Sequence, residues 1–340
     1  AAAAAAHRAA QLSGRPEVVA RGVVAHRLLL GRPDGADARL AHTHPLVGVH
    51  RHHVEPEQLA RIHLWRLTDC FELGDRDGVE RELAALRDQA RSLGQPYWLW
   101  LAQTWQALHA WVIGEEALAD ELAVAALDHV AGLDHPETML AYGIQLVGFR
   151  LQQGRGAEVV DLLSGAVADN PAVPGMRCAL AVALAQAGDH AQAGEHLSAL
   201  SADGFAAIPD DTNWAISMAS LAETASLLGD VHAAARLSAM LRPYRDRFVV
   251  VSAFGAGGGC WGPFSGVLAG LSERMGDEDA ARDDLDHALA AVTAFGSPPM
   301  CRRVTAQRDA MAGRITATGA VTAPGPVAVR SLRPPTRGPS

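Results

Sequence analysis

The fold is decided by the stretch Cys70-Phe71-Glu72-Leu73-Gly74-Asp75-Arg76-Asp77-Gly78-Val79-Glu80-Arg81-Glu82-Leu83, in which a glycine–aspartate pair separates two apolar segments. A glycine at this position is expected to end a helix in the left-handed conformation. The aspartate after it is expected to cap the next helix and to stabilise its positive end. The stretch therefore predicts a hairpin of two helices.

The same pattern recurs along the chain at intervals of 34 to 47 residues. A glycine followed by a charged residue stands at Gly74, Gly114, Gly154, Gly188, Gly229 and Gly276. In each copy a small or β-branched residue follows five positions later, a leucine follows eight or nine positions later, and a proline comes next. The small residue allows two helices to approach closely, and the proline stops the second helix. The pattern predicts six helix hairpins.

The expected helices follow from this spacing. First helices are predicted near 56–73, 97–113, 137–152, 173–187, 212–228 and 262–275. Second helices are predicted near 76–93, 115–131, 156–168, 189–201, 230–242 and 277–295. A weaker hairpin is expected at 17–30 and 36–44, and a capping helix at 299–312.

Composition supports a helical protein. Hydrophobic residues make up 49% of the 340 residues but aromatic residues only 5%, and alanine, the best helix former, dominates. The predicted fold class is therefore all-α: an α-α superhelix, or solenoid, of six to seven hairpins. We expect a low-complexity segment at 1–16, the helical repeat domain at 17–312, and a disordered tail containing proline and arginine at 313–340.

The charged residues exclude several kinds of chemistry. All 29 basic residues are arginine, so the chain cannot supply the lysine of a Walker A loop, of a protein kinase or of a Schiff base. A net charge of −9 argues against direct nucleic-acid binding. No apolar run is long enough to span a membrane, and four isolated cysteines favour a reduced, cytoplasmic setting.

The repeat pattern resembles tetratricopeptide repeats. More narrowly, the chain resembles the C-terminal helical-repeat region of actinobacterial ATP-dependent regulators, the LuxR-type (MalT-like) activators and the fusions of an adenylate cyclase to an AAA-type ATPase. The stretches that carry this resemblance are Trp65–Asp75, Asp211-Thr212-Asn213-Trp214, Leu227-Leu228-Gly229-Asp230, and Leu241-Arg242-Pro243-Tyr244 with the connector 249–262. The resemblance covers about residues 17–312.

The resemblance implies an interaction or effector-sensing module of a transcriptional or signalling regulator. It implies a protein or peptide partner, such as an ATPase module, or a small-molecule effector, bound in a concave groove. It implies no cofactor and, in the absence of a catalytic signature, no enzymatic activity. The alternative is a stand-alone helical-repeat enzyme or small-molecule-binding protein that uses an enclosed pocket in the groove.

Aromatic and amide side chains on the first helices are candidates to line that groove, because such residues suit the binding of a peptide or a small molecule. The candidates are Trp65, Trp98, Trp105, Tyr142, Gln145, Asn213, Trp214 and Trp261. The competing interpretation is that tryptophans at helical spacing pack in the core.

Two further patterns have weaker functional interpretations. His50 and His53, in a histidine-rich segment, have a spacing that suits a shared metal ion, against the alternative of a solvated connecting segment. The glycine-rich run 255–262 is predicted to be a connector between two repeats, against a loop that contacts an anion. Cys260 within this run is expected to be a buried structural thiol.

Overall fold

The structure is a computed structural model that describes residues 12–15, 18–19, 22–23, 35–133 and 135–322. Most of the low-complexity segment 1–16, most of the weak helix predicted at 17–30, and residues 323–340 lie outside these ranges. The described residues form fourteen α-helices and one two-stranded sheet. None of the helices in these ranges has both the length and the apolar composition needed to cross a membrane.

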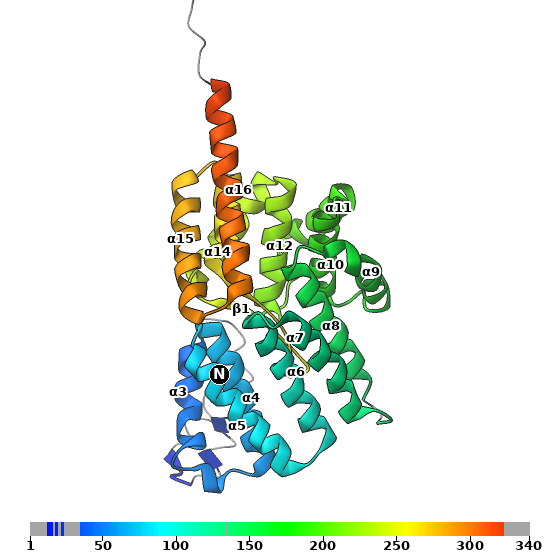
Figure 1. Ribbon diagram of the computed structural model, residues 1–340, viewed down its shortest axis with the longest axis vertical. Helices are drawn as coiled ribbons and strands as arrows, with labels where there is room; N and C mark the ends of the chain where they lie inside the picture. The colour runs from blue at the N-terminus through cyan, green and yellow to red at the C-terminus, as the bar shows by residue number, and fades with distance from the viewer. Residues whose placement is uncertain (1–11, 16–17, 20–21, 24–34, 134, 323–340) are drawn as a thin grey trace, which may run out of the picture.

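Six pairs of helices follow one another as the spacing of the glycines predicts (Figure 1). The pairs are α4 (Pro56–Leu73) with α5 (Arg76–Leu93), α6 (Pro96–Val112) with α7 (Glu116–Ala126), α8 (Pro136–Gln152) with α9 (Val160–Asp169), α10 (Pro174–Ala187) with α11 (His190–Ser201), α12 (Trp214–Leu228) with α13 (Val231–Leu241), and α14 (Phe264–Arg274) with α15 (Glu278–Phe295). Helix α3 (Ala36–Val47) precedes them, and α16 (Pro298–Thr322) follows. Short 3-10 turns are η2 (Arg51–His53), η3 (Leu127–Val130), η4 (Gly156–Val159) and η5 (Arg242–Tyr244).

The repeated glycine–acid pattern acts as predicted. All six glycines have positive φ, between 65° at Gly74 and 95° at Gly114, where a side chain would be strained. The aspartates that follow four of them cap the next helix, each side chain accepting a hydrogen bond from a backbone N–H three residues on. These caps are Asp75, Asp189, Asp230 and Asp277. Local sequence therefore sets the helix boundaries.

The prediction of an all-α fold is incomplete, because the expected connector after α13 is a β-hairpin. Strand β1 (Phe248–Ala253) pairs antiparallel with β2 (Ala256–Pro263), and every residue of β2 is buried. Three consecutive β-branched valines, Val249–Val251, favour an extended strand. The glycines of β2 let its backbone pass between closely packed helices, which is why the glycine-rich run lies inside the protein.

The two faces of β1 pack against different hydrophobic cores. Phe248 and Val250 join a core built mainly from α4, α5, α6 and α15. Val249 and Val251 join a second core built mainly from α8 and α10–α14. Because side chains alternate along a strand, one short hairpin links the two cores.

Elements far apart in the sequence also meet directly. Phe295 at the end of α15 packs against Phe71 and Phe248, with ring centroids 5.9 and 5.2 Å apart. The buried Ser297 hydroxyl donates a hydrogen bond to the Val112 carbonyl at 2.7 Å. Arg76 on α5 donates to the Gly296 carbonyl at 3.0 Å. In a linear solenoid each repeat contacts only its neighbours, so the predicted superhelical arrangement is not confirmed.

Helix α16 extends beyond the predicted end of the repeat domain. Residues 313–322, which we expected to belong to a disordered tail, are helical, because α16 continues to Thr322; the rest of the expected tail lies outside the described residues. Arg314 forms an ion pair with Glu273 on α14 at 2.7 Å, which fixes this part of the helix to the body. Nearer its start, Arg303 donates to Gln152 on α8 at 2.9 Å and pairs with Glu223 on α12.

The close contact between α8 and β2 gives a stability prediction. A Cβ on Gly148 would overlap the carbonyl oxygen of Gly258, whereas a Cβ on Gly143 of the same helix would meet nothing within 4 Å. We expect Gly148→Ala to lower the free energy of unfolding by more than about 2 kcal/mol. Gly143→Ala is expected to raise it by up to about 1 kcal/mol through helix propensity.

Urea denaturation of the two variants measures both effects. Equal stabilisation by the two substitutions would contradict the close contact between Gly148 and the hairpin.

Candidate functional site

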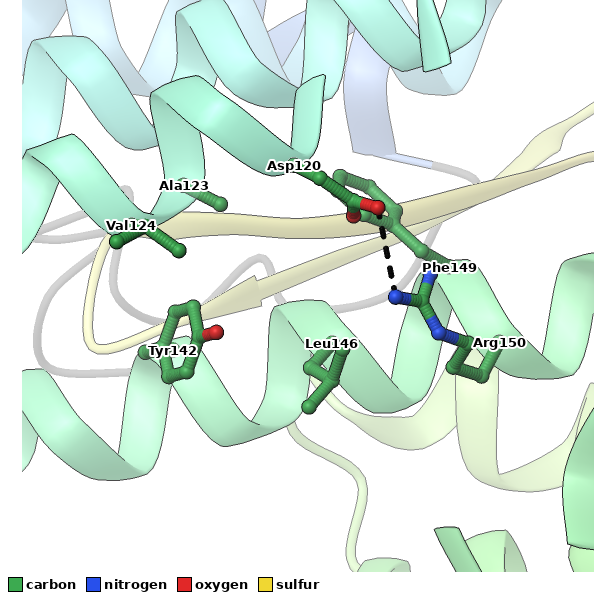
Figure 2. A pocket seen from close by; sticks show the side chains of 7 residues that line it. All are labelled: Asp120, Ala123, Val124, Tyr142, Leu146, Phe149 and Arg150. Atoms are coloured by element: carbon green, nitrogen blue, oxygen red, sulfur yellow. Dashed lines mark hydrogen bonds and ion pairs between the residues drawn. The ribbon is translucent and has the colours of Figure 1, made fainter. Parts of the chain in front are cut away.

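A cleft opens between helices α7 and α8. Its cavity has a volume of about 210 Å³ and is lined by Asp120, Ala123, Val124, Tyr142, Leu146, Phe149 and Arg150. Figure 2 shows Tyr142 on α8 opposite Val124 on α7, Leu146 farther along α8, and Asp120 and Arg150 facing each other at one end. The lining therefore combines apolar side chains with the Tyr142 hydroxyl and, at one end, the charged Asp120 and Arg150.

The cleft exists because α7 and α8 belong to different hairpins and touch at few points. Helix α7 packs closely on α6, the other helix of its hairpin, and α8 packs closely on β2. On α7 the small side chain of Ala123 does not fill the space that separates the two helices. The lining residues of α8 fall at positions i, i+4, i+7 and i+8, which place them on one face of that helix.

The floor of the cleft is rigid and its rim is exposed. Phe149 is buried and stacks on Trp111 of α6, with ring centroids 5.6 Å apart and planes 4° from parallel. Val124 on the rim is 55% exposed, and Met139, one turn before Tyr142 on α8, is 60% exposed. A surface with a firm apolar floor and exposed apolar rim residues is typical of a binding site.

The surroundings of the cleft are acidic. Arg150 pairs with Asp120 at 3.4 Å and lies 3.6 Å from a carboxylate oxygen of Glu158. The other ionisable side chains of α7, Glu116 and Glu121, are also acidic. Partly exposed ion pairs of this length contribute less than about 1 kcal/mol, so the Asp120 carboxylate is available to another cation.

Tyr142 is the one predicted groove residue that lines this cleft. Two others, Trp105 and Gln145, contact the chain's own β-hairpin instead. The Trp105 indole donates to the Gly255 carbonyl at 2.8 Å. The Gln145 amide donates to the Thr104 carbonyl at 2.9 Å and also to the Gly257 carbonyl. The face of α6 and α8 where we expected an external ligand is thus covered by β2.

The remaining tryptophan candidates are mostly core residues. Trp98, Trp105, Trp214 and Trp261 are between 0% and 8% exposed, in agreement with the packing alternative. Trp65 is partly buried, and Asn213 is exposed just before α12, where its backbone N–H donates to Asp211 at 2.8 Å. Ligand binding by these residues stays a prediction.

The histidine pair lies at the turn before α4. His53 is exposed, and its backbone N–H donates to the carbonyl of His50 at 2.9 Å in η2. No group of three or more metal-ligating side chains occurs among the described residues. The pair therefore has no third ligand in this part of the chain.

A buried cluster of ion pairs joins α3, α4 and α5. The spacing of residues in the sequence did not predict it. Arg39 pairs with Asp69 at 2.7 Å and also with Glu72. Glu82 accepts hydrogen bonds from Arg66 at 2.8 Å and lies 2.7 Å from Nδ1 of His63. Burial acts to raise the pKa of Glu82, but hydrogen bonds from His63 and Arg66, with the positive charge of Arg66, hold it below its usual value. The cluster stabilises the packing of the first helices.

A second buried carboxylate fixes the end of α13. Asp284 is fully buried on α15 and accepts from Arg242 at 2.8 Å and from Arg245 at 2.7 Å. The periodicity of α15 could not predict these ion pairs, because both arginines lie about 40 residues earlier in the chain.

The cysteines are structural. Burial raises the pKa of Cys70, Cys178 and Cys260 to about 12, which keeps these thiols protonated at neutral pH. The expectation of a buried thiol at Cys260 is confirmed. All four cysteines of the chain are free, with Cys301 partly exposed.

Comparison with protein-family models, with curated proteins and with solved structures returns no match for this chain. The resemblance to tetratricopeptide regulators stays a prediction.

The contribution of Glu82 to the free energy of unfolding is expected to depend on pH. Because the folded-state pKa of Glu82 lies below its ordinary value of 4.5, the stability it contributes is present above that value and is lost as the pH falls through the folded-state pKa. We expect Glu82→Gln to lower the free energy of unfolding by about 3 kcal/mol at pH 7, because buried Arg66 loses its counter-charge. The difference from wild type should shrink below about pH 4.5.

The matched control is Glu80→Gln on the same helix, where the Arg76–Glu80 pair is largely exposed. It should cost less than about 1 kcal/mol at every pH. Denaturant unfolding between pH 7 and pH 3 measures both variants, and a pH-independent deficit for Glu82→Gln would refute the assignment.

Proposed function

We propose that this chain is a helical-repeat interaction module that binds a peptide segment of a partner protein in the cleft between α7 and α8. The observation that carries the proposal is the open cleft that Tyr142, Val124 and Leu146 line, with the Asp120–Arg150 pair at its end. As in the regulators that the sequence resembles, the module serves a transcriptional or signalling protein in the cytoplasm, with an ATPase module among its possible partners.

The binding site that we propose does not lie on the inner face of α6 and α8. That face holds β2 through hydrogen bonds from Trp105 and Gln145 to backbone carbonyls of the hairpin. An external peptide there would have to displace a strand whose residues are all buried. The cleft between α7 and α8 needs no such displacement.

The size of the cavity favours a peptide over an enclosed small molecule. Pockets for drug-sized ligands measure roughly 300–1,000 Å³. A cavity of about 210 Å³ suits one or two side chains inserted from a longer segment that continues over the exposed rim. In peptide recognition, much of the affinity comes from a few side chains that insert into well-packed pockets. An apolar side chain inserted into this cleft would lie beside the polar groups at its end.

Selection from a random dodecamer peptide library tests the proposal. We expect peptides that combine an apolar side chain with arginine, because the cleft is apolar and its surroundings are acidic. Val124→Arg, which places a long cationic side chain on the rim, should weaken binding of the selected peptides by at least tenfold, as measured by fluorescence anisotropy.

The matched control is Leu227→Arg, which changes a similarly exposed apolar residue on α12. It should change affinity less than twofold, and the melting temperatures of both variants should stay near that of wild type. Peptides that bind the Val124→Arg chain as tightly as wild type would place the site elsewhere and overturn the proposal.

A further inference from the structure

Polar contacts at one end of the cleft join its two walls, α7 and α8. The helices touch each other at few points, so direct packing contributes little to the spacing between them. Arg150 of α8 donates to Asp120 of α7 at 3.4 Å, and the amide of Gln153 on α8 donates to Glu116 on α7 at 3.0 Å. The spacing of the walls therefore depends on polar side chains at the charged end.

The contact between Gln153 and Glu116 lies one helical turn beyond the lining of the cavity. Gln153 follows the lining residue Phe149 by four positions on α8. Glu116 precedes the lining residue Asp120 by four positions on α7. Residues four apart in a helix lie on the same face, so both side chains continue the two walls of the cleft.

Glu116 also contacts a third helix, α16. One of its carboxylate oxygens accepts a hydrogen bond from the Gln153 amide, and the other accepts one from the Arg302 guanidinium at 2.7 Å. The next residue of α16, Arg303, donates to the buried Gln152 of α8 at 2.9 Å. Two consecutive arginines of α16 thus contact both walls of the cleft, α7 through Glu116 and α8 through Gln152.

The start of α16 is attached firmly to the body of the protein. The buried Ser297 hydroxyl, directly before the helix, donates to the Val112 carbonyl at the end of α6. The side chain of Met300 is buried in the first core, and Arg303 also pairs with Glu223 on α12. Buried hydrogen bonds and apolar contacts stabilise a position more than an exposed ion pair does. The start of α16 can therefore hold α7 and α8 in place.

We propose that the start of α16, through Arg302 and Arg303, sets the spacing of α7 and α8 and thereby couples its own docking to binding in the cleft. Walls held at a fixed separation lose less conformational entropy when a side chain inserts between them. Because such coupling is reciprocal, a peptide that contacts both walls also stabilises the docked position of α16. Withdrawal of α16 from the body weakens binding in the cleft, which gives the site a means of regulation.

This inference rests on the cleft as the binding site of the proposed function, and it adds the regulation of that site. Replacement of Arg302 tests it, because the sign of the effect separates spacing from charge. Arg302→Gln removes the contact of α16 with Glu116 and makes the charged end of the cleft more negative. Loss of spacing should weaken the binding of library-selected peptides by about threefold, as measured by fluorescence anisotropy. An effect of charge alone would instead tighten the binding of peptides that contain arginine.

The matched control is Arg314→Gln. It removes an ion pair of the same length, 2.7 Å, from the far part of α16, where Arg314 contacts Glu273 on α14. The control should leave the affinity unchanged. Unchanged or tighter binding by the Arg302→Gln chain would overturn the inference. An equal loss of affinity in both variants would also overturn it, because the effect would not arise from the contact at the cleft.

The spacing can be measured without a ligand. Spin labels on Val124→Cys and Met139→Cys, which replace side chains that are more than half exposed, report the distance between α7 and α8 by pulsed electron spin resonance. Cys301→Ser removes the partly exposed thiol, and the other three cysteines are buried. We expect a broader distribution of distances when both Arg302 and Arg303 are replaced by glutamine. The single Arg302→Gln variant is measured alongside, because its side chain is 63% exposed and its loss leaves the fold intact.

Hydrogen exchange measures the coupling in the reverse direction. A saturating concentration of a selected peptide should slow the exchange of the backbone amides in residues 298–312 several-fold, because binding stabilises the docked helix. The same peptide should have no effect on these amides in the Val124→Arg chain, which does not bind it. Unchanged exchange in the wild-type chain at saturation would overturn the coupling.

The outcomes separate this inference from the proposed function. An unchanged distribution of distances in the arginine variants would overturn the role of α16 even if peptides bind in a manner sensitive to Val124→Arg. A broader distribution, together with the failure of every library peptide to bind, would support α16 as the element that sets the spacing. That second result would overturn the proposed function and, with it, the coupling to binding.

Discussion

The arrangement of the helices depends on one buried β-hairpin. Strand β2 is buried along its whole length, and β1 presents Phe248 and Val250 to one core and Val249 and Val251 to the other. A two-stranded hairpin alone is at best marginally stable in water, so the helices stabilise the hairpin as much as it joins them. Its backbone carbonyls have no further strand to pair with. The side chains of Trp105 and Gln145 donate hydrogen bonds to the carbonyls of Gly255 and Gly257. A buried carbonyl without a hydrogen bond would destabilise the fold.

This central hairpin determines where binding is possible. Tetratricopeptide-like hairpins would offer an inner face for a ligand, but here that face on α6 and α8 contacts the chain's own strand. The space that remains open lies between two successive hairpins, where α7 and α8 contact each other sparsely. The contact of Phe295 with Phe71 and Phe248 also joins the last hairpin to the first ones.

Much of the secondary structure could be predicted, because its signals are local. Gly74 and Asp75 end one helix and begin the next through their own backbone conformation and side-chain hydrogen bond, and the same holds for Gly229 and Asp230. The β-hairpin was missed because helical composition suggested a connector, although Val249–Val251 gave a signal for a strand. The buried charges were missed for a different reason. Asp284 meets Arg242 and Arg245, which lie in and just after the η5 turn about 40 residues earlier, and no spacing within α15 shows this.

The candidate site was predicted only in part. Tyr142 was identified as a binding candidate, but Val124, Leu146 and Asp120 were not, because only their position across the gap between two helices makes them neighbours. The sequence by itself determined where the helices begin and end, since glycine conformation, caps and prolines act within a few residues. Only the tertiary structure decided that the glycine-rich run would fill the inner face of α6 and α8 and that the cleft would open between α7 and α8. Both depend on how closely distant backbones approach one another, as at Gly148 and Gly258, and that distance is set by the packing of the whole chain.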